Sequence, residues 1–259
     1  MVGFQNSDHF RTAADVETCY RLGQRVSQLT YDEGNRLGGG CRSHRDGGLT
    51  AFGAEVVAEM DRVGMAIDVS HCGERTTLDA IRLSRKPVLV THSNCRALVP
   101  GQPRCKSDRV IRELARHGGV MGVTVVRAFV GRRSPAVEHV LDHFDHIARL
   151  AGIEHAGLGS DVDFEGADPK TGGRRYYAID GLCLPLRVFQ LADGLLRRGY
   201  GEAEVELVLG RNFQRALAGV WSGDPWWPPA EPPRRDPFCP APIRGPVSSR
   251  GAAPPSPRE

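Results

Sequence analysis

Three apolar runs of the sequence each end in a side chain that can bind a metal ion, and these side chains are His71, His92 and Asp161. A neutral imidazole and a carboxylate are typical ligands of hydrolytic zinc sites. A single polar residue at the end of a strand is more often satisfied by hydrogen bonds, but three at equivalent positions indicate a shared site. The sequence therefore predicts a metal centre that activates water for hydrolysis.

Parallel strands are the elements that would position these side chains. Short apolar runs alternate with longer stretches of helical period, which is typical of strands joined by crossover helices. In a parallel barrel the site lies at the carboxyl ends of the strands, so the three side chains would converge there. Six runs are predicted as strands: Val2–Gln5, Val26–Tyr31, Met65–His71, Pro87–His92, Gly119–Val126 and His155–Asp161.

The predicted helices carry start and stop signals. Apolar residues recur at helical spacing between Thr50, which favours an N-cap, and Gly64, which favours a helix end. Another helix is predicted from Ser134-Pro135 to Gly152. Two more are expected near the end of the barrel, at Pro185–Arg198 and Glu202–Val220.

The helix that ends at Gly152 carries three histidines on one face, His139, His143 and His146. Helical spacing alone is a weak guide to metal ligands. Because these residues are expected away from the strand ends, we interpret them as a solvated outer face.

The length of 259 residues is about that of one eight-unit barrel. Six βα units are found in register, and the first predicted strand begins at Val2. We therefore expect an α/β fold, a TIM-type (β/α)8 barrel that is incomplete, with about six βα units present and the first two missing. From Asp224 onward lie 12 of the 18 prolines. This composition favours disorder, so we expect a partial barrel over 1–223 and a Pro-rich disordered tail over 224–259.

The composition argues against several other classes of protein. Hydrophobic residues at 40% and charged residues at 25% are typical of a soluble globular chain. No apolar run reaches the ~18 residues of a membrane span, and no signal peptide is visible, so we expect a cytoplasmic protein. Seven cysteines without a Cys-x-x-Cys pair fit free thiols in a reducing compartment. A net charge of +3 gives no reason to expect nucleic acid or a membrane as a partner.

Five segments of the chain share an order and spacing with a known family, and they are Leu29–Gly38, Gly47–Gly53, Asp68–His71, Thr91–Asn94 and Gly159–Asp161. With these segments, the sequence resembles the membrane dipeptidase (renal dipeptidase) family of metallopeptidases, particularly its bacterial branch. The similarity runs from about Gly3 to Trp221. The family fold is a TIM barrel. The resemblance implies a hydrolase of dipeptides that depends on Zn²⁺, with two zinc ions in the family and one or two in this chain.

The resemblance also implies roles for individual residues. His71 and His92 match the two histidines that hold one zinc ion. Asp161 matches the acidic residue that exchanges protons with the attacking water and the leaving amine. Arg104 matches the arginine that receives the C-terminal carboxylate of the substrate, whose two oxygens an Arg fork can bind together. Tyr31 stands where many members have a histidine near the substrate carbonyl, and a phenol can donate a hydrogen bond there.

The sequence departs from the family pattern in its first strand. The family's opening strand supplies a His-x-Asp pair for the other zinc ion, and no such pair precedes Gly3. Gln5 occupies the place of the glutamate that bridges both metal ions. Because a neutral amide offers a cation no charge, we expect metal affinity to be impaired by this change and by the loss of the N-terminal strand.

Three hypotheses for the function remain open. The first is a zinc dipeptidase that acts on small dipeptides, with a homodimer as the assembly that the resemblance implies. The second is a related metal-dependent amidohydrolase that acts on another small amide or a lactam, because a fold does not determine its substrate. The third is a non-catalytic remnant of a dipeptidase, which the missing ligands favour.

Overall fold

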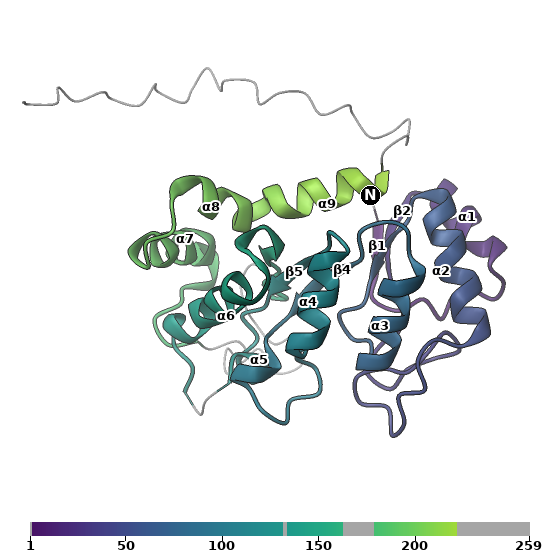
Figure 1. The fold of residues 1–259 in the computed structure, drawn as a ribbon, viewed down its shortest axis with the longest axis horizontal. Helices are drawn as coiled ribbons and strands as arrows, with labels where there is room; N and C mark the ends of the chain where they lie inside the picture. Colours follow the sequence, from purple (N-terminus) through teal and green to yellow (C-terminus); the bar gives the residue numbers. More distant parts are fainter. Residues whose placement is uncertain (1, 132–133, 163–178, 222–259) are drawn as a thin grey trace, which may run out of the picture. The chain divides into compact units, whose positions relative to one another are not determined.

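The computed structural model describes residues 2–131, 134–162 and 179–221, and six strands in these residues form one sheet (Figure 1). All neighbours in the sheet are parallel, and the strands follow each other in chain order. All six predicted strands are therefore present, with shorter bounds. They are β1 (Val2–Phe4), β2 (Gln24–Gln28), β3 (Ala66–Asp68), β4 (Leu89–Ser93), β5 (Val120–Val123) and β6 (Ala156–Leu158).

The three candidate metal-site residues lie at the carboxyl edge of this sheet, although not all at a strand end. β3 ends three residues before His71 and β6 ends three residues before Asp161, whereas His92 lies within β4. After β3 the chain turns at once, and the backbone N–H of Cys72 donates to the carbonyl oxygen of Val69 at 3.1 Å. The turns that leave the sheet thus carry two of these side chains.

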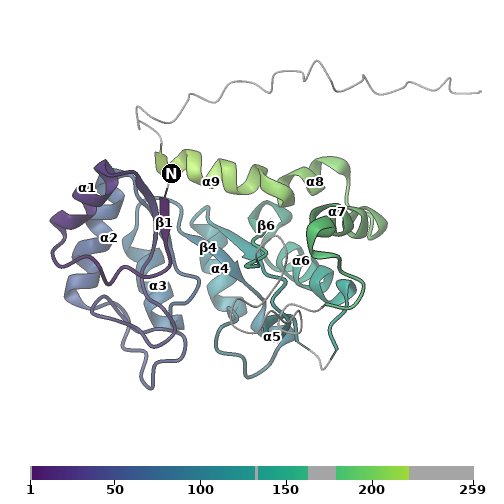
Figure 2. The ribbon, with the colours of Figure 1, turned by 180° about the vertical axis from the view of Figure 1, so that it is seen from behind.

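Each strand but the last is followed by at least one helix before the next strand begins. The helices pack against one another in sequence along the sheet, as the two opposite views show (Figures 1 and 2). They are α1 (Ala14–Arg21), α2 (Ala51–Val63), α3 (Glu74–Leu83), α4 (Asp108–Arg116), the short α5 (Arg127–Val130) and α6 (Val137–Ala151). This alternation is the repeating unit that the apolar pattern predicts.

Helix α2 begins and ends where the sequence predicts. The Thr50 hydroxyl accepts the backbone N–H of Gly53 at 2.9 Å, which satisfies one of the unpaired donors of the first turn. Gly64 follows the helix with a φ of 84°, a left-handed conformation that residues with a Cβ atom rarely adopt. Two local signals therefore fix both ends of this helix.

Helix α6 begins at Val137, just after the predicted start at Ser134-Pro135, and ends before Gly152 as predicted, but one residue of its histidine face is buried. His143 is fully buried, accepts the backbone N–H of Cys95 on Nδ1 at 3.1 Å and donates from Nε2 to the carbonyl oxygen of Val130 at 3.2 Å. Burial lowers the pKa of His143 to about 4. The expectation of an outer face is wrong for this residue, because α6 presents it to the segments that follow β4 and β5.

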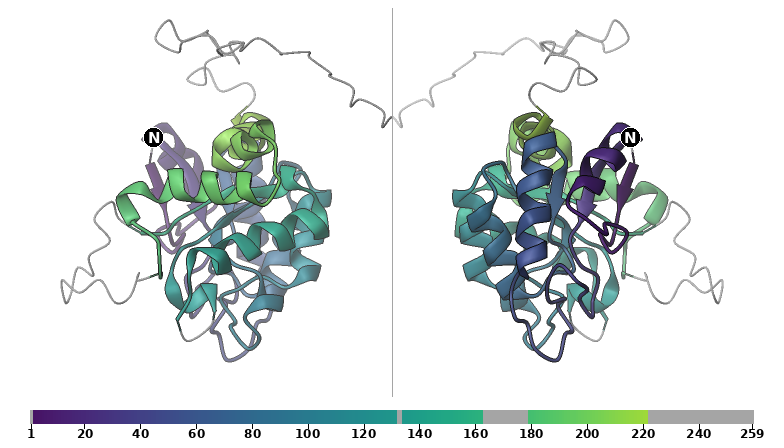
Figure 3. Two further views of the ribbon diagram at one scale, coloured as in Figure 1. Left: turned by 90° about the vertical axis from the view of Figure 1, so that its left-hand side faces the viewer. Right: turned by 90° about the vertical axis from the view of Figure 1, so that its right-hand side faces the viewer.

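The C-terminal helices close the amino end of the sheet. Helix α7 (Arg187–Arg197) matches its prediction, whereas the single helix predicted over 202–220 is divided into α8 (Glu202–Glu206), a π-helical turn η5 (Leu207–Arg211) and α9 (Asn212–Trp221). Asn212 donates to the carbonyl oxygens of Ile153 and Ala156, both at 2.8 Å, just before and at the start of β6. Figure 1 shows α9 crossing this end of the strands, opposite the turns that carry the candidate site, and Figure 3 shows the same helix nearly end-on.

The hydrophobic core lies between the sheet and the helices. Representative core residues from α2, β3, β4, α4 and α6 are Val56, Met60, Ile67, Val90, Ile111 and Phe144. No helix in the described ranges is long and apolar enough to cross a membrane. The predicted Pro-rich tail, 224–259, lies outside the described residues, and its disorder stays a prediction.

Candidate metal centre

The imidazole rings of His71 and His92 meet at the carboxyl edge of the sheet. Their Nε2 atoms are 3.0 Å apart and their ring centroids 5.1 Å apart. Both residues are buried, with 7% and 6% of their surface exposed. The turn after β3 and the adjacent strand β4 therefore bring together the two histidines that the sequence predicts as metal ligands.

The other ring nitrogen of His71 is held by a carboxylate. Nδ1 of His71 lies 2.6 Å from Oδ1 of Asp32, in the turn after β2. Burial raises the pKa of Asp32, but hydrogen bonds from His71 and Cys41 and the nearby charge of Arg42 lower it overall. An ionised carboxylate only accepts, so the proton of the neutral ring resides on Nδ1. Nε2 of His71 is left with its lone pair.

The second ring is held by a chain of hydroxyl groups. Thr91 donates its hydroxyl proton to Oδ2 of Asp68 at 2.7 Å, and Ser70 donates to Oδ1 of the same carboxylate at 2.6 Å. Because these protons are used, Thr91 can only accept from Nδ1 of His92, which lies 2.8 Å from its hydroxyl oxygen. Nε2 of His92 is therefore also left with its lone pair.

Both imidazoles are left in a form that can bind a metal ion. Burial, assisted by the charge of Arg104, lowers the pKa of His71 to about 4, and burial also lowers the pKa of His92, so both rings are neutral near pH 7. Two lone pairs that face each other at 3.0 Å repel unless a cation lies between them. Since Zn–N bonds are about 2.0–2.1 Å long, this separation suits two ligands of one ion.

Among the described residues, the candidate metal ligands that lie together are limited to this pair of imidazoles. Within the described part of the chain, no group of three His, Cys, Asp or Glu side chains gathers where it could hold a metal ion. Gln5, predicted at the place of a bridging glutamate, is exposed one residue beyond β1, and its backbone carbonyl accepts a hydrogen bond from the Gln28 side chain. The described residues thus provide a pair of imidazole ligands and no complete set of three.

Asp161 combines a shifted pKa with an unusual backbone conformation. Burial raises the pKa of its carboxyl group, while the charges of His92 and Arg104 oppose that shift. Among the residues that the structure describes, it is the only one other than glycine with a positive φ, 57°. Aspartate tolerates this conformation better than most residues, and such strained backbone is common at functional sites.

Tyr31 covers one face of the His71 ring. The two rings are stacked, with centroids 4.2 Å apart and planes inclined by 17°. Tyr31 is 45% exposed, so it presents part of its ring to solvent directly beside a candidate ligand.

Arg104, in the loop between β4 and α4, contacts the backbone of both segments that carry the histidines. It is 1% exposed, and its guanidinium group donates to the carbonyl oxygens of Ser70 at 2.6 Å and His92 at 2.8 Å. Its Nε has no hydrogen-bond partner among the described residues. The side chain predicted to bind substrate therefore also joins the turn after β3 to β4.

Sequence reasoning assigned no role to several residues of this network. Asp32 and Asp68 lie within the segments that resemble the family, but their importance depends on contacts with residues far away in the sequence. Lys106 is likewise buried, and donates to the carbonyl oxygens of Val69 at 2.7 Å and Cys72 at 2.9 Å. Burial lowers its pKa to about 8. Only its position two residues after Arg104 connects it with the predicted site.

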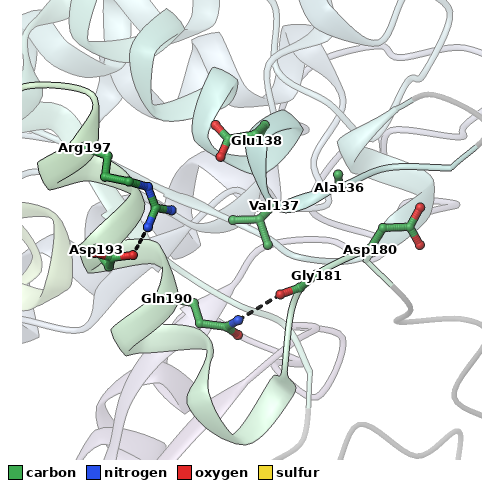
Figure 4. Close-up of a pocket in the computed structure, with 8 residues that line it drawn as sticks. All are labelled: Ala136, Val137, Glu138, Asp180, Gly181, Gln190, Asp193 and Arg197. Atoms are coloured by element: carbon green, nitrogen blue, oxygen red, sulfur yellow. Dashed lines mark hydrogen bonds and ion pairs between the residues drawn. The ribbon is translucent and has the colours of Figure 1, made fainter.

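The cavity drawn in Figure 4 is separate from the histidine pair. It has a volume of ≈ 330 Å³ and lies between the start of α6, Asp180-Gly181 and α7. Two interactions link residues around it, the Asp193–Arg197 ion pair and the 2.8 Å hydrogen bond from Gln190 to the carbonyl oxygen of Gly181. None of its lining residues belongs to the network around His71 and His92.

The curated relatives of this chain include dipeptidases. A dipeptidase of Clonostachys rogersoniana, dipeptidase verJ, is 34% identical over 208 residues, which are 79% of this chain and 50% of that protein. Dipeptidase 3 of Rattus norvegicus is 31% identical over 228 residues, 85% of this chain and 44% of that protein. The chain thus spans about half the length of these curated relatives.

Solved structures confirm the predicted fold class. An amidohydrolase from Pseudomonas aeruginosa superposes with a TM-score of 0.74 at 32% identity, covering 85% of this chain and 72% of that chain. A dipeptidase AC of metallopeptidase family M19 gives a TM-score of 0.66 at 25% identity, covering 84% and 72%. The fold is of the TIM-barrel α/β type, with six of its strands in the described residues. The family model for the membrane dipeptidases, peptidase family M19, matches residues 1–222, and the chain belongs to this family.

Proposed function

We propose that the protein hydrolyses dipeptides with a zinc ion that is bound by His71 and His92. Membership of the membrane dipeptidase family supports the reaction. The observation that carries the proposal is the 3.0 Å separation of two Nε2 atoms whose lone pairs face each other, with both Nδ1 protons already donated elsewhere. Neutral imidazole ligands favour zinc over magnesium or calcium, which prefer oxygen.

A zinc ion supplies two kinds of chemistry when it is bound, because it lowers the pKa of a bound water and polarises a carbonyl group. Asp161 accepts the proton of the attacking water and delivers it to the nitrogen that leaves. The burial that raises the pKa of Asp161 favours holding that proton between the two events. Tyr31, beside His71, donates a hydrogen bond from its phenol group to the substrate carbonyl.

Arg104 would receive the C-terminal carboxylate of the dipeptide. Two of its donors are used by backbone carbonyl groups, whereas Nε–H is a buried donor without a partner among the described residues. A carboxylate satisfies such a charged donor with a strong hydrogen bond. Because Arg104 is fixed close to His92, this contact would place a peptide bond near the histidines only in a very short peptide.

The direct test measures amino acids released from a panel of dipeptides by the purified protein with added zinc. We expect turnover that is lost in His71→Ala and kept in His155→Ala, since His155 lies at the amino end of β6 and bonds the carbonyl of Gly119. Zinc bound by the wild-type protein without turnover on any dipeptide would overturn the peptidase proposal. If dipeptides with a C-terminal amide are turned over as fast as dipeptides with a free carboxylate, the result would instead support the hydrolysis of another small amide.

A further inference from the structure

The carboxylate of Asp32, in the turn after β2, contacts three side chains, and one of them is the His71 ring. Its Oδ1 accepts from Nδ1 of His71 at 2.6 Å and from the thiol of Cys41 at 3.3 Å. Its Oδ2 forms an ion pair with Nε of Arg42 at 3.1 Å. Both carboxylate oxygens are thus occupied, and the carboxylate is oriented with one oxygen toward the imidazole.

The backbone fixes the distance between Asp32 and His71. The consecutive N–H groups of Cys41 and Arg42 donate to the carbonyl oxygens of His71 at 2.8 Å and of Asp32 at 2.7 Å. Two neighbouring peptide groups therefore tie together the segments that carry the carboxylate and the imidazole. Moving the two backbone segments apart would have to break one of these bonds.

A glycine makes this close packing feasible. A Cβ atom at Gly40 would lie 2.1 Å from the carbonyl oxygen of Tyr31 and 2.2 Å from that of Asp32. Any larger residue at position 40 would push away the turn that carries both Tyr31 and Asp32. The approach of the 40–42 segment to this turn is thus built into the sequence.

The His71 ring is held on its face and on its edge by two consecutive residues. Tyr31 stacks on the ring with centroids 4.2 Å apart, while Asp32 binds Nδ1. The remaining ring nitrogen, Nε2, is the one that faces His92. A free imidazole exchanges its proton between both nitrogens, so a fixed tautomer requires a partner of this kind.

We propose that Asp32 is a positioning residue that keeps the proton of His71 on Nδ1 and thereby aims the Nε2 lone pair at a metal ion. Carboxylates that orient metal-binding imidazoles in this way raise metal affinity by about 10- to 100-fold. The effect on metal affinity rests on the proposed zinc site. The effect on the tautomer does not, because it is a property of the metal-free protein.

The first experiment reads the tautomer directly, from the ¹⁵N chemical shifts of the imidazoles in the full-length, metal-free protein. We expect His71 to be protonated on Nδ1 in the wild type and to become a mixture of tautomers in Asp32→Ala. His92 serves as an internal control, since Thr91 and Asp68 hold it independently of Asp32. An unchanged Nδ1–H tautomer of His71 in Asp32→Ala would overturn the proposal.

The second experiment measures zinc affinity by competition with a chromophoric chelator. We expect Asp32→Ala to bind zinc about 10- to 100-fold more weakly, and Asp32→Asn, which keeps an acceptor oxygen, to recover part of the loss. Arg42→Gln is the matched control, because it removes the ion pair and leaves the bond to His71. Equal affinity in all variants would contradict the positioning role. If the wild-type protein binds no zinc but Asp32→Ala still changes the tautomer of His71, the zinc site alone would be refuted. If Asp32→Ala does not fold, Asp32→Asn replaces it in both experiments.

Discussion

The guanidinium group of Arg104 donates to the backbone carbonyl oxygen of His92 at 2.8 Å. The same group donates to Ser70, directly before His71, so one buried cation connects the two chain segments that carry the histidines. Since both imidazoles project from these segments, Arg104 influences their separation. The residue that resemblance associates with substrate binding therefore also contributes to the architecture of the site.

Replacing Arg104 by methionine should destabilise the metal-free protein. The change removes two hydrogen bonds from a charged donor to buried carbonyl oxygens, each worth about 1.5–3 kcal/mol. We expect the free energy of unfolding in urea to fall by about 3–6 kcal/mol. Arg116→Met is the control, because Arg116 and its partner Glu113 are exposed to solvent and such pairs contribute about 0–1 kcal/mol. Equal losses in both variants would show that Arg104 does not clamp the strands.

A more conservative replacement, Arg104→Lys, should separate the structural contribution of Arg104 from its contribution to substrate binding. Lysine keeps the positive charge but cannot make the same set of directed bonds. We expect kcat/KM for dipeptides to fall by about 10- to 100-fold, mostly through KM, and to fall less for dipeptides with a C-terminal amide. The ratio of the two substrates is the measurement. A ratio that does not change would mean that the substrate carboxylate binds elsewhere.

Asp161→Asn should lower kcat without releasing the metal ion. Asparagine tolerates the positive φ of this position and fills a similar volume, so the backbone can remain as it is. General acid–base groups contribute typically about 10²–10⁴-fold to the rate, and we expect a loss in this range with little change in zinc affinity. Asp180→Asn, an exposed site, is the control. Full activity in Asp161→Asn would assign the proton transfer to another group.

Local signals predicted the parts of the structure that depend on neighbours in the sequence. Thr50 and Gly64 bound α2 because capping and a left-handed conformation are properties of single residues. The position of His71 and His92 at one edge of the sheet followed from strand order alone. These features need no knowledge of tertiary contacts.

The parts that sequence reasoning missed depend on contacts between distant segments. Asp32 is an ordinary turn residue until the fold places it 2.6 Å from a ring 39 residues away. The helix predicted over 202–220 is interrupted at Gly210, where the backbone leaves helical geometry although the apolar pattern continues. His143 lies on a polar helix face, and only the N–H of Cys95 and the carbonyl of Val130 make its burial favourable.

The burial of His143 leads to a prediction about stability in acid. Its pKa of about 4 in the folded protein is lower than the ordinary value of about 6.5, so the unfolded chain binds a proton that the folded chain does not. As the pH falls from about 6.5 to about 4, this difference should reduce the free energy of unfolding by at most about 3 kcal/mol. Below pH 4 both states are protonated and the contribution stops changing. In His143→Gln, whose amide can make both hydrogen bonds without titrating, we expect a flatter dependence in urea unfolding between these pH values. His44→Gln, at an exposed position, should follow the wild type, and a wild-type slope in His143→Gln would assign the acid sensitivity to other groups.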